Sequence, residues 1–154
     1  MNDTELAYFA GAIDADGFFA IRRATKGNST SFFEMLGLGQ VSPIVPEMLK
    51  ARFGGYITTR KRTEPAATNW RVMYYWHATT KIAANAVEEL RPYLRLKCRQ
   101  ADIILEMRES KKIPYSQRRG TRTGVRAYTT NPDIQAHRAA LHEEMIRINH
   151  HGLV

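Results

Sequence analysis

FAGAIDADG, residues 9–17, is the stretch of sequence that decides the fold. It joins helix-forming residues to an internal glycine, Gly11, and then places Asp14 and Asp16 just before Gly17. A glycine inside a helix costs about 1 kcal/mol relative to alanine. Negative charge at a helix C-terminus is opposed by the helix dipole. The stretch therefore predicts a helix that ends at Gly17, with a close contact along one side and a positive partner at its end.

One side of this helix lacks bulky side chains. Ala7, Ala10, Gly11 and Asp14 follow one another at helical spacing, so they share a face. Small residues allow the backbone of another element to approach closely. The pattern is consistent with a second helix packed against this face, and equally with packing of Gly11 against the chain's own sheet.

The two acids at the helix end have two interpretations. A divalent cation would offset their charge, because Mg²⁺ binds carboxylate and carbonyl oxygens and keeps several of its waters. Asp14 and Asp16 are alternatively solvated turn residues, since aspartate is common in turns. The residue pattern alone leaves both open.

The rest of the chain predicts an α+β domain. The first helix begins near Asp3 or Thr4. Apolar periodicity and turn residues then predict strands over 18–24 and 32–41, a helix over 42–53, strands over 56–62 and 70–78, and helices over 79–91 and 96–108. Residues 110–130 read as a basic loop or flexible arm, and a last helix runs from Asn131 to Gly152. We expect one domain, with a core over 1–110 and the arm and last helix over 111–154.

Charge and cysteine content narrow the class of protein. The 154 residues include 23 Lys and Arg against 15 Asp and Glu, a formal charge of +8. This excess favours a polyanionic partner such as nucleic acid, although a merely soluble basic surface would also carry it. Cys98 is the only cysteine, which excludes an intrachain disulfide and predicts a reducing compartment. With no long apolar run, we expect a soluble intracellular protein, in the cytoplasm of a bacterium or phage-infected cell or in an organelle.

Residues 9–17 resemble the motif that names the LAGLIDADG homing endonucleases, and they depart from it only at Phe9 and Ala12. Two further segments are similar to family positions: LGLGQVSP at 36–43 and LRPYLRLKCRQ at 90–100. The resemblance covers roughly residues 4–110. It implies the family's αββαββα fold, a four-stranded antiparallel saddle-shaped sheet with helices on one face, here followed by a C-terminal helix.

The resemblance also implies roles for individual residues. In the family, two motif helices pack side by side, which would place Ala7, Ala10 and Gly11 in the helix pair and Asp14 as a cap on the partner helix. Asp16 would bind the catalytic Mg²⁺, with Mn²⁺ or Ca²⁺ as substitutes for binding, and the carbonyl of Ala15 would be a second ligand. Gln40 would order active-site water, and Lys97 would stabilise charge at the scissile phosphate. As alternatives, Gln40 is an ordinary strand-end residue and Lys97 a solvated lysine.

A single motif implies a homodimer, because cleavage of both DNA strands needs two sets of acids. The expected activity is that of a metal-dependent DNA endonuclease encoded by a mobile intron or similar element. It would cut one phosphodiester per strand of a long, nearly palindromic double-stranded site and leave short 3′ overhangs. No small-molecule cofactor or membrane partner is expected. The alternatives are a relative that binds without cutting, as an intron RNA maturase or a transcriptional regulator, and an interaction protein without nucleic acid.

The sheet face that the helices leave free is the expected DNA surface. Arginine reads base edges or contacts phosphate, and strand alternation places every second residue on one side. The predicted DNA-binding residues are Arg22, Lys26, Arg60, Arg62, Arg71, Tyr75, His77, Arg118, Arg119 and Arg122. For each strand arginine the alternative is a solvated charged face, and for the 110–130 arm it is an ordinary surface loop.

Overall fold

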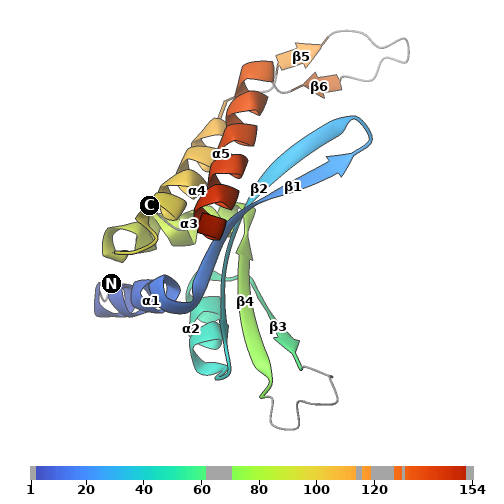
Figure 1. Ribbon diagram of the computed structural model, residues 1–154. Helices are drawn as coiled ribbons and strands as arrows, with labels where there is room; N and C mark the ends of the chain where they lie inside the picture. Colours follow the sequence, from blue (N-terminus) through green and yellow to red (C-terminus); the bar gives the residue numbers. More distant parts are fainter. Residues whose placement is uncertain (1–2, 62–70, 114–115, 119–126, 130, 152–154) are drawn as a thin grey trace.

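The computed structural model describes residues 3–61, 71–113, 116–118, 127–129 and 131–151 (Figure 1). The side chains of 116–118, 127–129 and 151 are outside this description. The elements in chain order are α1 (Asp3–Asp16), β1 (Gly17–Lys26), β2 (Ser29–Gln40), α2 (Ile44–Phe53), β3 (Tyr56–Arg60), β4 (Met73–Thr79), α3 (Thr80–Leu90), the 3₁₀ turn η1 (Arg91–Tyr93), α4 (Cys98–Ser110), β5 (Ser116–Arg118), β6 (Ala127–Thr129) and α5 (Pro132–His151). The predicted order of helix, two strands, helix, two strands and helices is confirmed.

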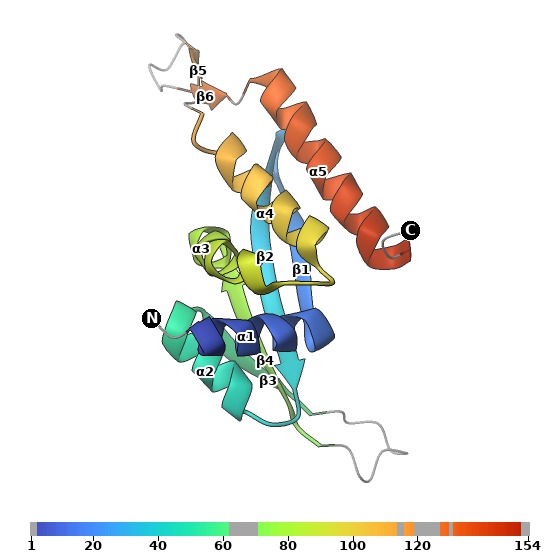
Figure 2. The same ribbon diagram turned by 90° about the vertical axis from the view of Figure 1, so that its left-hand side faces the viewer.

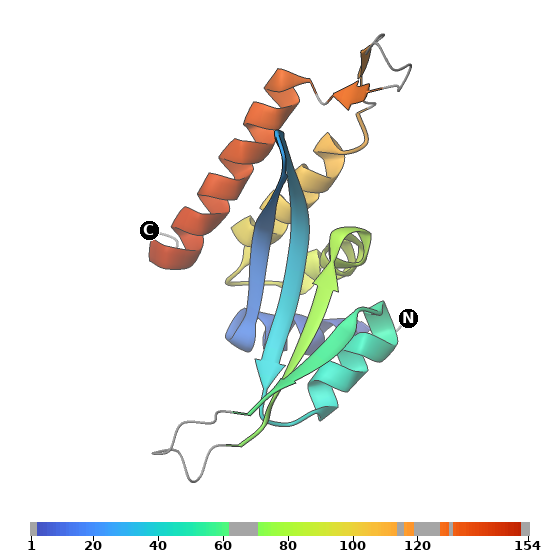
Figure 3. The same cartoon turned by 90° about the vertical axis from the view of Figure 1, so that its right-hand side faces the viewer.

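Strands β1 to β4 form one antiparallel sheet in the order β1-β2-β4-β3. The helices pack on one face of this sheet, as Figures 1 and 2 show, and Figure 3 looks onto the face that they leave open. The fold predicted for the sheet and its helices is therefore correct. No helix among the described residues is long and apolar enough to cross a membrane.

Helix α1 is joined to β1 without any loop. Leu6, Phe9 and Ile13 anchor one side of the helix in the core. A Cβ at Gly17 would lie 2.7 Å from the carbonyl oxygen of Ile13, so a larger residue could not make this turn without moving the backbone. Gly17 thus allows the strand to start directly after the helix, and it holds Asp16 at the junction of helix and sheet.

The β1–β2 hairpin is longer than its hydrophobic pattern predicts. Its register pairs Gly17 with Leu38 at one end and Lys26 with Ser29 at the other, across a turn in which Gly27 has a φ of +58°. Burial alternates in β1 only as far as Ile21, and the rest of the strand is exposed. From Arg22 onward β1 has no buried side and needs no apolar alternation, which is why the pattern misplaced the end of this strand. Strand β2 stays buried on one side as far out as Phe32.

Helix α5 covers the outer edge of β1. As predicted, it starts at Asn131–Pro132–Asp133, where the Asn131 side-chain oxygen accepts a hydrogen bond from the Asp133 amide at 2.8 Å. His142 Nδ1 and Asn149 Nδ2 each donate to a β1 carbonyl, of Ile21 and Phe19, at 2.9 Å. These bonds occupy acceptors on a strand edge that would otherwise be open to pairing.

The segment between α4 and α5 differs in part from its prediction as a loop. Residues 116–118 and 127–129 pair as a short antiparallel hairpin, β5 and β6. At the start of the predicted arm, Lys111 and Lys112 form ion pairs with Glu34 and Glu109, at 2.5 Å in each case. The remaining arm residues lie outside the described chain. The domain boundary at residue 110 stays a prediction, and α5 packs against β1 and α4.

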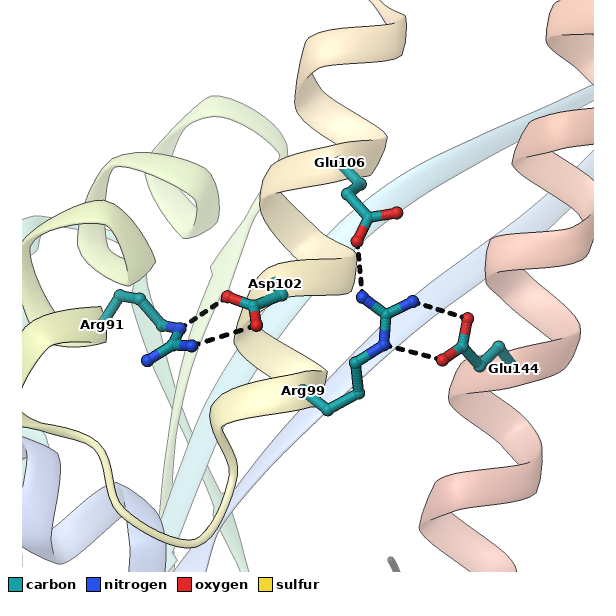
Figure 4. Close-up of polar contacts among 5 residues, drawn as sticks. All are labelled: Arg91, Arg99, Asp102, Glu106 and Glu144. Carbon is teal, nitrogen blue, oxygen red and sulfur yellow. Dashed lines mark hydrogen bonds and ion pairs between the residues drawn. The ribbon is translucent and has the colours of Figure 1, made fainter.

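Arginines tie α4 to its neighbours (Figure 4). Arg99 donates to both carboxylate oxygens of Glu144 on α5, at 2.7 and 2.8 Å, and to Glu106 at 2.5 Å. Arg91 forms a similar two-bond pair with Asp102, at 2.5 and 3.0 Å. The hydrogen bonds from Arg99 lower the pKa of Glu144 below its ordinary value of 4.5.

We expect Glu144→Gln to lower the free energy of unfolding by about 0.5–1 kcal/mol at pH 7, because the pair is half-exposed and screened by solvent. A lowered pKa in the folded state stabilises the protein above the unfolded value and loses this effect as pH falls through the folded value. The difference from wild type should therefore shrink as pH falls below 4.5 and vanish once pH is below the folded pKa of Glu144. Urea unfolding across pH 3–7 tests this. Glu143→Gln, at an exposed neighbouring position, is the control and should match wild type throughout.

Candidate active site and nucleic-acid interface

Asp16 and Gln40 meet at the junction of α1 and the sheet. Asp16 is the last residue of α1 and Gln40 the last of β2, and the pairing of Gly17 with Leu38 brings these two ends together. The Gln40 side-chain amide donates to Asp16 Oδ2 at 3.2 Å. The Asp16 carboxylate is exposed, so it remains accessible from outside the chain.

Lys97 reaches the same junction from the start of α4. Its ammonium group donates to the carbonyl oxygens of Ile13, at 2.9 Å, and of Gly17, at 2.7 Å. Ile13 lies in the last turn of α1 and Gly17 directly follows the helix, so Lys97 sits at the helix C-terminus, where a cation is favoured by the helix dipole. Burial lowers the pKa of Lys97, and the negative charges of Asp14 and Asp16 oppose that shift. The three predicted catalytic residues, from three separate elements, are thus brought together.

Asp14 has a role within its own chain that the sequence did not predict. Its buried carboxylate accepts the backbone N–H groups of Arg95 at 2.6 Å, Leu96 at 3.2 Å and Lys97 at 3.0 Å. It therefore holds the loop before α4 of its own chain. The contact predicted between Asp14 and a partner's helix stays a prediction. Asp14 also fixes the backbone that carries the Lys97 side chain.

We expect Asp14→Ala to lower the free energy of unfolding by about 3 kcal/mol, since an unsatisfied buried polar group costs about 1–3 kcal/mol and three N–H groups lose their acceptor. Asp16→Ala, two residues along the same helix, is the control. It removes an exposed acid from a helix C-terminus and should change stability by less than about 0.5 kcal/mol. Urea denaturation of both variants measures the difference. Equal losses would show that the Asp14 contacts contribute little.

The donors at the junction fit a hard cation only in part. Asp16 offers a carboxylate, and Ala15 beside it is exposed, so its carbonyl is a reasonable second oxygen. Within the described residues there is no group of three or more His, Cys, Asp and Glu side chains that could hold a metal.

Helix α1 lies toward the viewer in Figure 2, and its outward side is exposed at Ala7, Gly11 and Ala15. A Cβ added at Gly11 would meet nothing within 4 Å, and Ala7 and Ala15 are also exposed. This excludes packing of Gly11 against the chain's own sheet. The predicted set is corrected for Ala10, which is fully buried in the core and has no surface left for a second chain. The four residues predicted to share a face lie across the border between the exposed and the buried side of α1. Ala7 and Gly11 are exposed, whereas Ala10 and Asp14 are buried.

Large apolar side chains are exposed around this side of α1. Tyr8 on α1 is 52% exposed, Leu96 before α4 is 67% exposed and Ile44 at the start of α2 is 62% exposed. Figure 2 shows that α1 lies between α2 and the loop that leads to α4. Exposed apolar residues gathered on neighbouring elements are typical of a protein-protein contact.

The open face of the sheet carries rings and basic groups. The strand register places Phe18, Gly37, His77 and Tyr56 in one row across all four strands. The rings of Phe18 and Tyr56 lie 6.0 and 5.2 Å from the His77 ring. In β1 to β4 the only carboxylate is Glu34, and it is fully buried on the helix side of β2. The open face of the strands is therefore free of acidic groups.

The structure places several of the predicted DNA-binding residues on this face. Arg22 and Lys26 share the side of β1 that holds Phe18, and the Arg60 guanidinium lies 5.9 Å above the Tyr75 ring. Tyr75 stacks on His77, with the ring centres 6.2 Å apart. Arg71 is exposed just before β4. Arg62, Arg119 and Arg122 lie outside the described residues, and so does the side chain of Arg118.

His77 is set among groups that the sequence did not single out. Its Nε2 lies 3.1 Å from the hydroxyl of Thr58 on β3, the residue that pairs with Tyr75 in the strand register. Burial lowers the pKa of His77, and the positive charges of Arg60 and Arg22 lower it further. Thr58, Tyr56 and Phe18 could have been found from the sequence only by fixing the strand register, because none of them carries a charge.

Solved structures share this arrangement of helices and sheet. The archaeal intron-encoded homing endonuclease I-Vdi141I, complexed with DNA, matches with a TM-score of 0.67 and 16% identity over 94% of this chain and 84% of that chain. The homing endonuclease I-CvuI, in complex with the I-CreI target in the presence of Mg, matches with a TM-score of 0.66 and 19% identity over 93% and 80%. The LAGLIDADG homing endonuclease I-GzeII, in complex with its DNA target, matches 70% of this chain and 36% of its own, with a TM-score of 0.57 and 14% identity.

The chain has the LAGLIDADG homing endonuclease fold. Its sequence matches no protein-family model and no curated protein. The likeness therefore lies in the arrangement of elements and in the motif of α1, whose last acid stands where the helix meets the sheet of this fold.

Proposed function

We propose that the protein is a site-specific DNA endonuclease that acts as a homodimer on double-stranded DNA. The observation that carries the proposal is the convergence of Asp16, Gln40 and Lys97 at one end of α1, beside a basic sheet face without carboxylates. A carboxylate that can bind a metal ion, an amide that can orient water and a half-buried ammonium group are a set suited to phosphodiester hydrolysis. The fold is similar to that of homing endonucleases solved in complex with DNA, and this similarity supports the same activity.

Duplex DNA is the partner that suits the open face. The major groove of B-DNA admits antiparallel strands, and basic side chains there neutralise phosphates. Arg22, Lys26 and Arg60 lie on this face with no acid among them. The net charge of +8 adds a general attraction to the polyanion, so binding should weaken steeply as salt rises.

A twofold dimer accounts for the exposed side of α1. Pairing of two α1 helices through Ala7 and Gly11 would cover these residues and bring the two Asp16 carboxylates close to the twofold axis. The two open sheet faces would then form one long surface. The target would be palindromic or nearly so, because each half meets an identical protein surface.

In the proposed reaction Asp16 and the Ala15 carbonyl would hold Mg²⁺, which when bound activates water and stabilises the leaving oxygen. Gln40, hydrogen bonded to Asp16, orients the water that attacks the phosphorus. Lys97, held at the same end of α1 by the Ile13 and Gly17 carbonyls, would offset the negative charge that develops on the phosphate. The bond from phosphorus to the 3′ oxygen breaks once on each strand. By analogy with the family, the ends would be short 3′ overhangs.

A cleavage selection tests the proposal. Purified protein and Mg²⁺ are incubated with a plasmid library that carries long randomised inserts, and linear products are sequenced from their ends. We expect cleaved inserts that share one nearly palindromic sequence, with ends that report the overhang. Retention of a specific duplex without cutting it, in Mg²⁺ and in Mn²⁺, would instead favour a DNA-binding or maturase role. Failure to bind any duplex would refute the proposal.

A further inference from the structure

Three apolar side chains interrupt the basic surface of the β1–β2 hairpin. The register pairs Ala20 with Met35, and Arg22 with Phe33 in the next row toward the tip. All three apolar residues, Ala20, Phe33 and Met35, are half-buried. Their neighbours along the strands, Phe19 and Glu34, are buried on the helix side. Ala20, Phe33 and Met35 therefore lie on the open face, and we call them the methyl patch.

Folding of the chain does not account for the methyl patch. The solvent side of a half-covered antiparallel sheet is normally polar, because apolar residues there gain nothing from the core. No helix of the described chain packs on this face, as Figure 3 shows. Closer to the hairpin tip the same face returns to polar groups, with Ser29 opposite Lys26. The methyl patch thus lies between the row of rings around His77 and the polar tip of the hairpin.

The chemistry of the major groove points to one ligand. Base edges there present hydrogen-bond donors and acceptors, and the only apolar group is the 5-methyl group of thymine. Apolar side chains opposite any other edge would leave its polar atoms without partners, at a cost in affinity. The 5-methyl group of 5-methylcytosine occupies the same place in the groove and offers the same surface.

We propose that the methyl patch recognises the 5-methyl group of a pyrimidine, thymine in unmodified DNA, in each half of the target site. The proposal rests on the DNA-binding function proposed above. A strand and a DNA chain both advance about 3.4 Å per residue, and the patch is four to six positions beyond Asp16 along β1. The contacted thymine should therefore lie about four to six base pairs from the scissile phosphate.

Replacing thymine with 2′-deoxyuridine tests the contact, because it removes the methyl group and leaves base pairing intact. One thymine position at a time is replaced in both half-sites of the selected site. The dissociation constant of the protein for each duplex is then measured in Ca²⁺. We expect a loss of about fourfold per half-site at the contacted position, the equivalent of about 0.8 kcal/mol for one buried methyl group. At a cytosine placed there, 5-methylation should raise affinity by a similar factor.

Variants of the patch identify the protein side of the contact. Met35→Ala and Phe33→Ala should reduce the preference for thymine over deoxyuridine at the contacted position to less than about twofold. Ser31→Ala changes an exposed residue of the same strand and face, so it should keep the full preference. Urea unfolding verifies that each variant is folded. Because preference is a ratio measured on one protein, a partial loss of stability does not alter it.

Two kinds of result would refute the proposed role of the methyl patch without refuting the endonuclease activity. One is a cleaved site whose affinity no deoxyuridine lowers, or which contains no thymine at these positions. The other is a Met35→Ala and Phe33→Ala pair that discriminates as wild type does. A protein that selects no sequence at all would refute the proposed function, and this inference with it.

Discussion

Asp16→Asn is expected to reduce DNA cleavage by about a thousandfold or more while leaving affinity for the duplex within about twofold. The exchange keeps the size of the side chain and its hydrogen bond to Gln40 but removes the charge that would bind Mg²⁺. A catalytic cation contributes several kcal/mol to the transition state, and each 1.36 kcal/mol is about tenfold in rate. Binding survives because the open sheet face, not the α1 terminus, supplies the basic groups.

Single-turnover cleavage of the selected site measures the rate, and equilibrium binding in Ca²⁺ measures affinity. Glu88→Gln on α3 is the control, since it removes the same charge from an exposed site on another helix. It should cut at the wild-type rate. Cleavage by Asp16→Asn at more than about a tenth of that rate would contradict the assignment of the metal ligand.

The fold could be predicted because its local signals agree with one another. Periodicity in α1, the glycine that ends it and the turn at Gly27 each indicate the same sequence of elements. The boundaries were less accurate where burial does not decide them. In the outer half of the β1–β2 hairpin, β1 is exposed on both sides, so its residues carry no alternation that would mark where this strand ends.

The candidate site could be predicted only through the family resemblance. Gln40 is 24 positions from Asp16, and Lys97 contacts a carbonyl 84 positions away, so no local spacing relates them. The role of Asp14 was missed for the same reason, because its three donors are more than 80 positions further along the chain. A carboxylate in a motif has a charge that the sequence reveals, whereas its partners are set by tertiary packing.

Helix faces show a second limit of sequence reasoning. Adjacent positions such as Ala10 and Gly11 are separated by about 100° around the helix, so one stripe of small residues can lie across the boundary between core and surface. Leu6 and Phe9 are buried in the core and so fix which side of α1 faces inward, and Ala10 lies on that side. Lys111 shows the converse, since a basic run predicted a solvated arm while Glu34, buried in β2, holds this lysine against the sheet.

Gly11→Leu is expected to leave the fold of the single chain intact and to abolish dimerisation and cleavage. Nothing within 4 Å would meet a Cβ at this position, so the chain itself has room for the side chain. Leucine is also a better helix former than glycine by about 0.8 kcal/mol, which should stabilise the isolated chain slightly. A helix packed closely against Gly11, in contrast, would have to move away.

The size of the effect follows from the twofold axis. Overpacking a close contact costs about 1–3 kcal/mol, and a symmetric interface contains the substitution twice. The dimerisation constant should therefore weaken by about a thousandfold, and cleavage of both strands should weaken with it, because the two Asp16 carboxylates no longer share one duplex. Ala140→Leu places the same side chain at an exposed position on α5 and should behave as wild type.

Sedimentation equilibrium with and without the selected duplex measures the dimer, and gel analysis of nicked and linear plasmid measures cleavage of one or both strands. We expect wild type and Ala140→Leu to form dimers on DNA and to produce linear plasmid, whereas Gly11→Leu remains a monomer with little product of either kind. A dimeric, fully active Gly11→Leu variant would show that α1 pairs through a different side. Wild-type protein that stays monomeric both free and on DNA would overturn the twofold model altogether.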